Sequence, residues 1–432
     1  MNFYNLKHKE EQLNFKEATI KGQGKEKGLF FPEDISKFSN EFLQNLPNLS
    51  NEEIAFQVMK NFAGDEIPEA ELRKIVAETI AFEIPLKKVT EDISVLELFH
   101  GPTLAFKDVG ARFMSRCLGY FLKNETRKVT VLVATSGDTG GAVANGFYDV
   151  EGIEVVILYP KNRVSPVQEK QLTALGKNIH ALEVNGSFDD CQALVKQAFS
   201  DESLNEELLL TSANSINVAR WLPQQIYYVL ALKQWLKIHS ENPVICVPSG
   251  NFGNICAGIL AHHRGLPVEH FIAACNVNDV VPEYLRTEIL KPKETVATIS
   301  NAMDVGDPSN FVRILELFDK EFNQVKNKLS GYTIDDEETL KTIERVEKDY
   351  GYVLDPHGAV AFVALEKYLA ENGGKGFFLE TAHPVKFPDS VEKATGKSVE
   401  IPKSLEELMT QEKFTTEINP QYEELKEFLL KK

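Results

Sequence analysis

The sequence predicts an α/β fold built on open, mainly parallel sheets that carry helices on both faces. Short runs of buried, β-type residues alternate with helical patterns over most of the chain beyond residue 95. Two of these runs lead into glycine-rich loops, and a helical pattern follows each loop. Alternating strands and helices are typical of crossover connections, which make a sheet parallel and gather ligands at the carboxyl ends of its strands.

Periodicity and turn residues justify the elements in chain order. Helical patterns near residues 51–62 and 68–82 lie in an N-terminal region of different character. An apolar stripe from Phe106 to Leu122 predicts the next helix, after the chain break at Gly101-Pro102. Strands are expected at 129–134, 155–159, 208–210, 244–247, 270–275 and 377–379, and helices from about Gly141 and at 167–175, 189–199 and 254–262. One long amphipathic helix is expected at residues 218–237. The pattern also predicts a polar helical region at 285–350 and a surface helix at 400–432.

Composition excludes several function classes. The 432 residues carry 47 basic and 64 acidic side chains, so the net charge of 47 − 64 = −17 disfavours nucleic acid and anionic membranes as partners. The five cysteines form no CxxC pair, which fits reduced thiols in the cytoplasm. No apolar run approaches the roughly 18 residues of a membrane span, and the N-terminus lacks the pattern of a signal or transit peptide. We therefore expect a soluble, cytoplasmic protein.

Lys107 has an unusual position for a lysine. At helical spacing it lies at the edge of the apolar stripe, in line with Met114 and Leu118, and in the first turn of the predicted helix. Partial burial and the helix dipole both favour the neutral amine, which is the form that reacts with a carbonyl group. The alternative is a lysine that opens a helix and extends its ammonium group to water.

The two glycine-rich loops are candidate anion sites. The first, Thr135-Ser136-Gly137-Asp138-Thr139-Gly140-Gly141, offers hydroxyls and backbone N–H groups at a helix start. The second, Pro248-Ser249-Gly250-Asn251-Phe252-Gly253-Asn254, has glycines that allow close approach of a ligand. An ordinary strand-to-helix turn with capping residues is the alternative for the first loop. Neither loop matches a dinucleotide fingerprint or a P-loop.

Three further positions could bind anions or polar groups. Asn214 and Arg220 flank a predicted helix start, where a dipole and a guanidinium would hold a phosphate or carboxylate. The alternative is a helix cap at Asn217 with Arg220 in solvent. Thr381 closes a late strand and so is expected at the carboxyl edge of the sheet. The nine histidines have no HxxxH spacing and no GxSxG elbow is present, so neither a metal site nor a serine hydrolase is predicted.

Five motifs in this order, HGPTLAFKD, ATSGDTGGA, NSINVARWLPQQ, PSGNFGN and TAHPVKF, resemble the threonine synthase family. This family belongs to the pyridoxal-phosphate enzymes of the tryptophan-synthase-β fold type (fold type II). The resemblance implies residues 96–390 as a catalytic region of two three-layer α/β subdomains. It also implies residues 1–95 as an N-terminal, mainly helical α/β domain similar to that of the bacterial and fungal branch. Residues 391–432 would be a C-terminal helical tail.

The resemblance also implies the cofactor, pyridoxal 5′-phosphate, and the residues that hold it. Lys107 would form the Schiff base with the cofactor, and Thr381 would hydrogen-bond its pyridine nitrogen. Asp138 stands where many relatives place an asparagine beside the 3′-oxygen of the cofactor. The cofactor phosphate would lie in the second loop, against Gly250, Asn251, Phe252, Gly253 and Asn254.

The substrate implied is O-phospho-L-homoserine, which water converts to L-threonine and phosphate in the last step of threonine biosynthesis. Thr135, Ser136, Gly137 and Thr139 would bind its carboxylate or phosphate, and Asn214 and Arg220 its phosphate. Lys107 would act as the base at the α-carbon. A serine/threonine dehydratase, a phosphohomoserine-degrading lyase and a non-catalytic sensor are the alternatives. The family includes monomers and dimers, so a monomer or a homodimer is expected.

Overall fold

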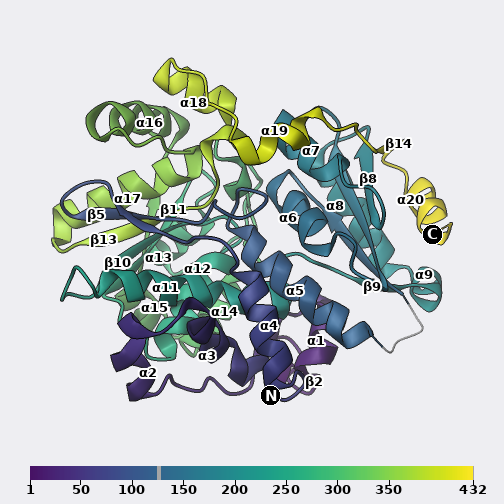
Figure 1. The fold of residues 1–432 in the computed structure, drawn as a ribbon, viewed down its shortest axis with the longest axis horizontal. Helices are drawn as coiled ribbons and strands as arrows, with labels where there is room; N and C mark the ends of the chain where they lie inside the picture. Colours follow the sequence, from purple (N-terminus) through teal and green to yellow (C-terminus); the bar gives the residue numbers. More distant parts are fainter. Residues whose placement is uncertain (124–127, 432) are drawn as a thin grey trace.

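The computed structural model describes residues 1–123 and 128–431. Two α/β halves lie side by side, and helices α5 (Lys107–Leu122) and α6 (Asp138–Phe147) lie toward the middle (Figure 1). The larger half holds a six-stranded sheet and the smaller half a five-stranded sheet. The open-sheet α/β class predicted from the sequence is confirmed.

The six-stranded sheet is parallel except for one edge strand. Its order is β12 (Leu329–Thr333), β11 (His270–Cys275), β10 (Val244–Pro248), β13 (Gly376–Glu380), β5 (Ile93–Glu97) and β4 (Leu86–Lys88). Only β4 pairs antiparallel, with β5. The central strands β10, β11, β13 and β5 are buried at every residue, as expected when helices cover both faces. Because β10 and β13 are parallel neighbours, the loops that follow them leave the sheet at the same edge.

The five-stranded sheet is parallel throughout. Its order is β14 (Thr416–Ile418), β8 (Ile179–Val184), β7 (Ile153–Pro160), β6 (Val129–Ala134) and β9 (Leu209–Thr211). The strand β6 is a continuous apolar run, VTVLVA, and is buried at all of its residues. Its C-terminal end passes directly into the first glycine-rich loop and α6.

The N-terminal region forms a small antiparallel sheet and four helices. The sheet order is β2 (Gln12–Asn14), β1 (Asn2–Asn5) and β3 (Phe30–Pro32). The helices are α1 (Phe15–Lys21), α2 (Asn40–Asn45), α3 (Asn51–Ala63) and α4 (Glu69–Thr79). Their buried residues join the same hydrophobic cluster as α5 and the strands of both halves, which ties this region to the two α/β halves.

The other helices cover the sheets or connect them. In the smaller half these are α7 (Pro166–Thr173), α8 (Phe188–Ser200), α9 (Glu202–Glu207) and α20 (Tyr422–Leu430). The larger half has α12 (Gly253–His263), α13 (Val280–Thr287), α14 (Phe311–Leu317), α15 (Phe322–Lys328), α16 (Asp336–Tyr350), α17 (Pro356–Asn372) and α18 (Pro388–Thr395). The helix α19 (Lys403–Thr410) packs on α7. Among the residues described, no helix is long and apolar enough to cross a membrane.

Several sequence predictions were wrong in detail. The helix expected over 218–237 is divided into α10 (Val218–Trp221), a 3-10 turn (Leu222–Gln224) and α11 (Gln225–Trp235). Pro223 interrupts it, and its residues are buried on nearly all sides rather than along one face. The region 285–350 contains β12, and the tail after 400 contains β14. Helix α6 begins at Asp138, three residues before Gly141.

Candidate active site

Lys107 is the first residue of α5, and a compact turn fixes that helix start. The hydroxyl of Thr103 donates to Asp108 Oδ1 at 2.5 Å, and the backbone N–H of Thr103 donates to Oδ2 at 2.9 Å. A Cβ on Gly101 would lie 2.4 Å from Asp108 Oδ2, so the turn needs glycine there. The buried carboxylate of Asp108 thereby anchors the turn to the first helical residues.

Backbone hydrogen bonds bring Lys107 beside the end of β13. The N–H of Phe106 donates to the carbonyl of Thr381 at 2.9 Å, and Ala105 forms a β-bridge with Ala382. Thr381 is 7% exposed. Thr381, the predicted ring-nitrogen ligand, and Ala382 after it are thus tied to the segment that carries Lys107.

The environment of Lys107 favours the neutral amine. Burial lowers the pKa of Lys107 to about 8, and the positive charges of Lys386 and Arg220 contribute to the lowering, while Asp138 opposes it. The amine lies near the Phe106 ring, 5.8 Å from the centroid. This is the protonation behaviour expected of an amine that reacts with a carbonyl group near neutral pH.

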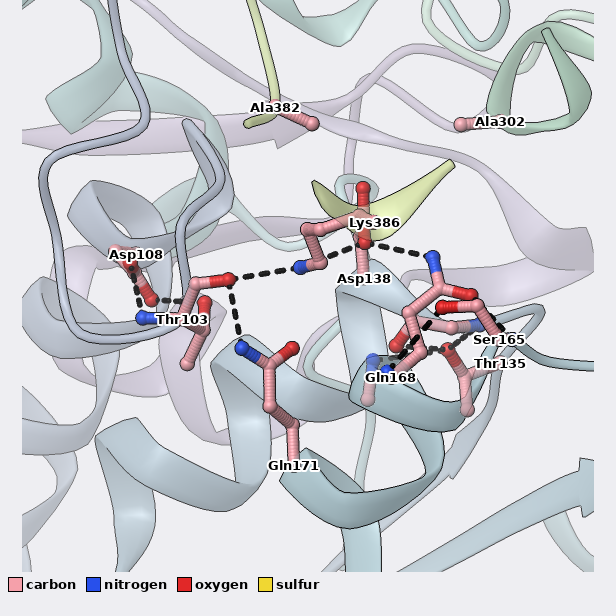
Figure 2. Close-up of polar contacts among 12 residues, drawn as sticks. Thr103, Asp108, Thr135, Asp138, Ser165, Gln168, Gln171, Ala302, Ala382 and Lys386 are labelled. Atoms are coloured by element: carbon pink, nitrogen blue, oxygen red, sulfur yellow. Dashed lines mark hydrogen bonds and ion pairs between the residues drawn. The ribbon is translucent and has the colours of Figure 1, made fainter. Parts of the chain in front are cut away.

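A buried ion pair lies beside this amine. The ammonium of Lys386 contacts Asp138 Oδ1 at 2.7 Å and donates to the carbonyl of Thr103 at 2.8 Å (Figure 2). Asp138 also accepts from Gln168 Nε2 at 2.9 Å. Burial raises the pKa of Asp138, but Lys386, Lys107 and Gln168 outweigh it and hold that pKa well below its usual range. The pair joins the loop after β6 to the segment after β13, and so connects the two halves.

The first glycine-rich loop is held by its own threonine. Thr135 Oγ1 accepts from the N–H groups of Gly137 at 3.0 Å and Gly140 at 2.9 Å. Gly137 has φ 139°, and a Cβ there would lie 2.5 Å from Gln168 Cδ, so the position requires glycine. Ser136 and Thr139 are only partly buried. Thr135 therefore shapes the loop, while Ser136 and Thr139 remain accessible at the helix start.

The second loop lies close to a neighbouring turn. A Cβ on Gly250 would lie 2.7 Å from Met303 Cα, so a larger residue would displace the loop. Phe252 adopts φ 61°, in the left-handed region, and α12 begins at Gly253. The first N–H groups of α12 have no intrahelical partner, and the positive end of its dipole faces the loop. Together these features provide a cradle for an anion.

Asparagine side chains complete the second loop. Asn254 Oδ1 accepts from the hydroxyl of Tyr228 at 2.6 Å, which fixes the amide, and Asn254 Nδ2 is buried without a partner among the residues described. Asn251 Nδ2 donates to Ser215 Oγ at 2.8 Å, and its Oδ1 accepts from Ser309 N at 2.7 Å. The contact with Ser215 links this loop to the segment that carries Asn214.

Arg220 is buried rather than solvated. Its Nη1 donates to the carbonyl of Ala213, and its Nε has no partner among the residues described. A Cβ on Gly110 of α5 would lie 2.6 Å from the Arg220 carbonyl oxygen, so α5 and α10 are in close contact. Burial lowers the pKa of Arg220 to about 10, which leaves it cationic at neutral pH.

The helix that carries Arg220 has an asparagine cap. Asn217 accepts from the N–H of Ala219 at 3.0 Å and so caps α10. Asn214, which precedes this cap, is partly exposed.

Sequence reasoning missed three side chains that hold the site together. Lys386 and Gln168 both contact Asp138, and Ser215 contacts Asn251. Lys386 lies within the motif TAHPVKF. A basic residue shortly after a predicted strand end was therefore the one local feature that could have pointed to it. Its partner is distant in sequence and lies in the other half of the molecule, where no local pattern indicates it.

Models of known families cover almost the whole chain. Residues 81–377 match the family of pyridoxal-phosphate dependent enzymes, residues 2–80 the threonine synthase N terminus, and residues 358–429 the threonine synthase C-terminal family. Threonine synthase of Serratia marcescens is 47% identical over 405 residues, covering 94% of this chain and 93% of that protein. The chain belongs to the threonine synthase family.

Solved structures of that family have the same fold. The crystal structure of threonine synthase from Escherichia coli is 45% identical with a TM-score of 0.93, and covers 100% of both chains. The PLP-bound threonine synthase from Brucella melitensis is 35% identical with a TM-score of 0.93, covering 99% of this chain and 98% of that one. The fold type II architecture predicted from the sequence is confirmed.

Proposed function

We propose that this chain converts O-phospho-L-homoserine and water to L-threonine and phosphate, with pyridoxal 5′-phosphate as cofactor. The observation that carries the proposal is Lys107, an amine with a pKa of about 8 that lies where the Thr381 and Asp138 segments meet. Similarity to threonine synthases over the whole chain supports the same reaction. The enzyme is thus a lyase of threonine biosynthesis.

The residues present fit this cofactor. The second glycine-rich loop offers backbone N–H groups at the start of α12 and the unpaired amide of Asn254, which suit a phosphate. Gly250, Asn251, Phe252 and Gly253 would complete that cradle. Thr381 would contact the pyridine nitrogen, and the Asp138 carboxylate would lie near the 3′-oxygen. A threonine hydroxyl at the ring nitrogen supplies no charge to hold a proton there.

Lys107 performs the proton transfers in this mechanism. When bound, pyridoxal phosphate supplies the aldehyde for the amines and stores the electrons released at the α-carbon. The Lys107 amine, once free, takes the proton from the α-carbon and returns protons later in the cycle. Its pKa of about 8 makes it an effective base near neutral pH, because a useful fraction is unprotonated there.

The phosphate and carboxylate of the substrate need fixed donors. We assign these to Ser136, Gly137 and Thr139 at the start of α6, with Thr135 shaping the loop from inside. Asn214 and the buried, cationic Arg220 would bind the phosphate and stabilise it as it leaves. A substrate without phosphate would leave the Arg220 guanidinium unpaired, which argues against a dehydratase.

Product analysis tests this proposal. Purified protein loaded with pyridoxal phosphate is incubated with O-phospho-L-homoserine, and threonine, inorganic phosphate and 2-oxobutyrate are measured. Equal amounts of threonine and phosphate are expected, and 2-oxobutyrate in their place would indicate the degrading lyase. Lys107→Ala should abolish turnover, whereas Lys403→Ala, at the exposed start of α19, should leave it unchanged. Absence of any product from the loaded enzyme would overturn the proposal.

We also propose that the enzyme acts in the cytoplasm. All five cysteines, at positions 117, 191, 246, 256 and 275, are buried and free, as expected of thiols in a reducing compartment. Fractionation of cells that express the chain would test this location. Whether the chain is a monomer or a homodimer stays a prediction, and sedimentation of the purified protein would decide it.

A further inference from the structure

The Asp138–Lys386 pair is costly to bury, which calls for an explanation. The Lys386 side chain is 0% exposed and that of Asp138 is 6% exposed, so both charges are removed from water. Replacing such a pair with apolar residues is often neutral or stabilising. The pair lies beside the one amine that the reaction needs to be neutral, so its position suggests a use other than stability.

The pair is held rigidly from both halves of the molecule. Lys386 lies in the 3-10 turn after β13 (Pro384–Lys386) and donates to the carbonyl of Thr103, which also accepts from Gln171 Nε2 at 3.0 Å (Figure 2). Asp138 is held by Gln168, whose amide is fixed by its capping contacts with Ser165. The carboxylate therefore has little freedom to turn away from Lys107.

Three charged side chains influence the protonation of the Lys107 amine. Asp138, Lys386 and Arg220 act on Lys107. Lys386 acts in turn on Asp108 and on His383. Burial lowers the pKa of His383 to about 4, so this histidine is neutral under ordinary conditions. The charges that face Lys107 at neutral pH are thus one carboxylate and two cations.

We propose that Lys386 is a positioning residue of the Lys107 site, where its ammonium group fixes the Asp138 carboxylate beside the amine and balances its negative charge. Without Lys386, only Arg220 would oppose the charge of Asp138, and the carboxylate would favour the protonated form of Lys107. Without Asp138, two uncompensated cations would oppose protonation of Lys107. The pair thus places a hydrogen-bonding carboxylate at the site without holding the reactive amine as an ammonium ion.

This inference predicts opposite signs for two single substitutions. Lys386→Met should raise the apparent pKa of Lys107 by about one unit, because the Asp138 charge is then opposed by Arg220 alone. Asp138→Asn should lower it by about one unit, because the Lys386 and Arg220 charges are then unopposed. The double variant Asp138→Asn/Lys386→Met removes a pair of zero net charge and should return the value to within about half a unit of the unmodified chain. Loss of packing alone would not produce opposite signs.

The measurement is competitive chemical labelling of lysines in the full chain after removal of the cofactor. The labelled fraction of the Lys107 peptide is followed by mass spectrometry across a pH series, and its midpoint gives the apparent pKa. Lys426→Met, on α20, is the matched control, because it breaks the 2.6 Å ion pair with Asp201 at the start of α9 without touching the site. This control should leave the Lys107 midpoint unchanged.

The inference rests on the proposed role of Lys107, but this readout requires neither cofactor nor turnover. Inactivity of the loaded enzyme would thus count against the proposed function and not against the charge coupling. Shifts in the same direction in both single variants, or no shift in either, would overturn the inference. Should Lys386→Met fail to fold, Asp138→Asn and the double variant test the inference. A raised or unchanged Lys107 midpoint in Asp138→Asn would contradict the inference. A double variant that fails to restore the Lys107 midpoint would also contradict it.

Discussion

Replacing Lys107 with methionine should stabilise the folded, cofactor-free chain at neutral pH while it abolishes catalysis. The environment holds the pKa of Lys107 at about 8 in place of 10.5, which means that burial of its charged form is unfavourable. At about 1.4 kcal/mol for each pH unit, this corresponds to about 3 kcal/mol in favour of the variant below pH 8. Methionine keeps an unbranched apolar stem at the same place in α5.

The pH dependence distinguishes this charge effect from packing. Between pH 8 and 10.5 the unfolded chain binds a proton at Lys107 that the folded chain has lost, so the stability of the unmodified protein rises with pH in that window. The variant lacks this rise. The difference in unfolding free energy should therefore be largest at pH 7 and should decrease steadily above pH 8.

Urea unfolding of the full-length, cofactor-free protein at several pH values measures this difference. Lys403→Met is the control, since Lys403 is also the first residue of a helix, α19, but is exposed. It should change stability little at any pH. A Lys107→Met protein that is less stable than the unmodified chain at pH 7, or a difference that does not depend on pH, would refute the reasoning.

Three further substitutions test the construction of the site. Gly137→Ala forces a side chain onto φ 139° within 2.5 Å of Gln168, so thermal unfolding should show a loss of about 1–3 kcal/mol together with a raised KM; unchanged values would contradict the loop geometry. Gly250→Ala places a Cβ 2.7 Å from Met303 Cα, so equilibrium dialysis should show weaker cofactor binding, and unaltered affinity would argue against the cradle. Asp108→Ala removes both hydrogen bonds to the turn before α5, so kcat should fall more than KM changes. An unaffected kcat would show that the turn does not orient the lysine.

The sequence alone predicted several strands that consist of a continuous apolar run. The strands at 129–134 and 270–275 have the predicted bounds, because continuous apolar runs are typical of strands buried on both faces. The strands β12 and β14 were missed, because they are short, partly exposed edge strands. The strands β5 and β8 were also missed, although they are largely buried and lie inside their sheets. The strands β12 and β14 are recognised by their pairing with β11 and β8, which the residue pattern of β12 and β14 does not reveal.

The site shows the same division between local and distant information. Lys107, at the edge of an apolar stripe and at a helix start, has a position that periodicity alone predicts. The Asp138–Lys386 pair joins residues that are 248 positions apart, since 386 − 138 = 248, and no local pattern indicates it. The interruption at Pro223 was visible in the sequence, but the burial of α11 on nearly all sides depends on the surrounding elements.

Reduction of the loaded enzyme tests the central claim most directly. Borohydride fixes the cofactor covalently to the amine that holds it, and peptide mass spectrometry then locates that amine. Two lysines lie together at this site, Lys107 and Lys386, so the result discriminates between neighbours. The account predicts the added mass on Lys107 alone. Mass on Lys386, or on neither, would contradict it.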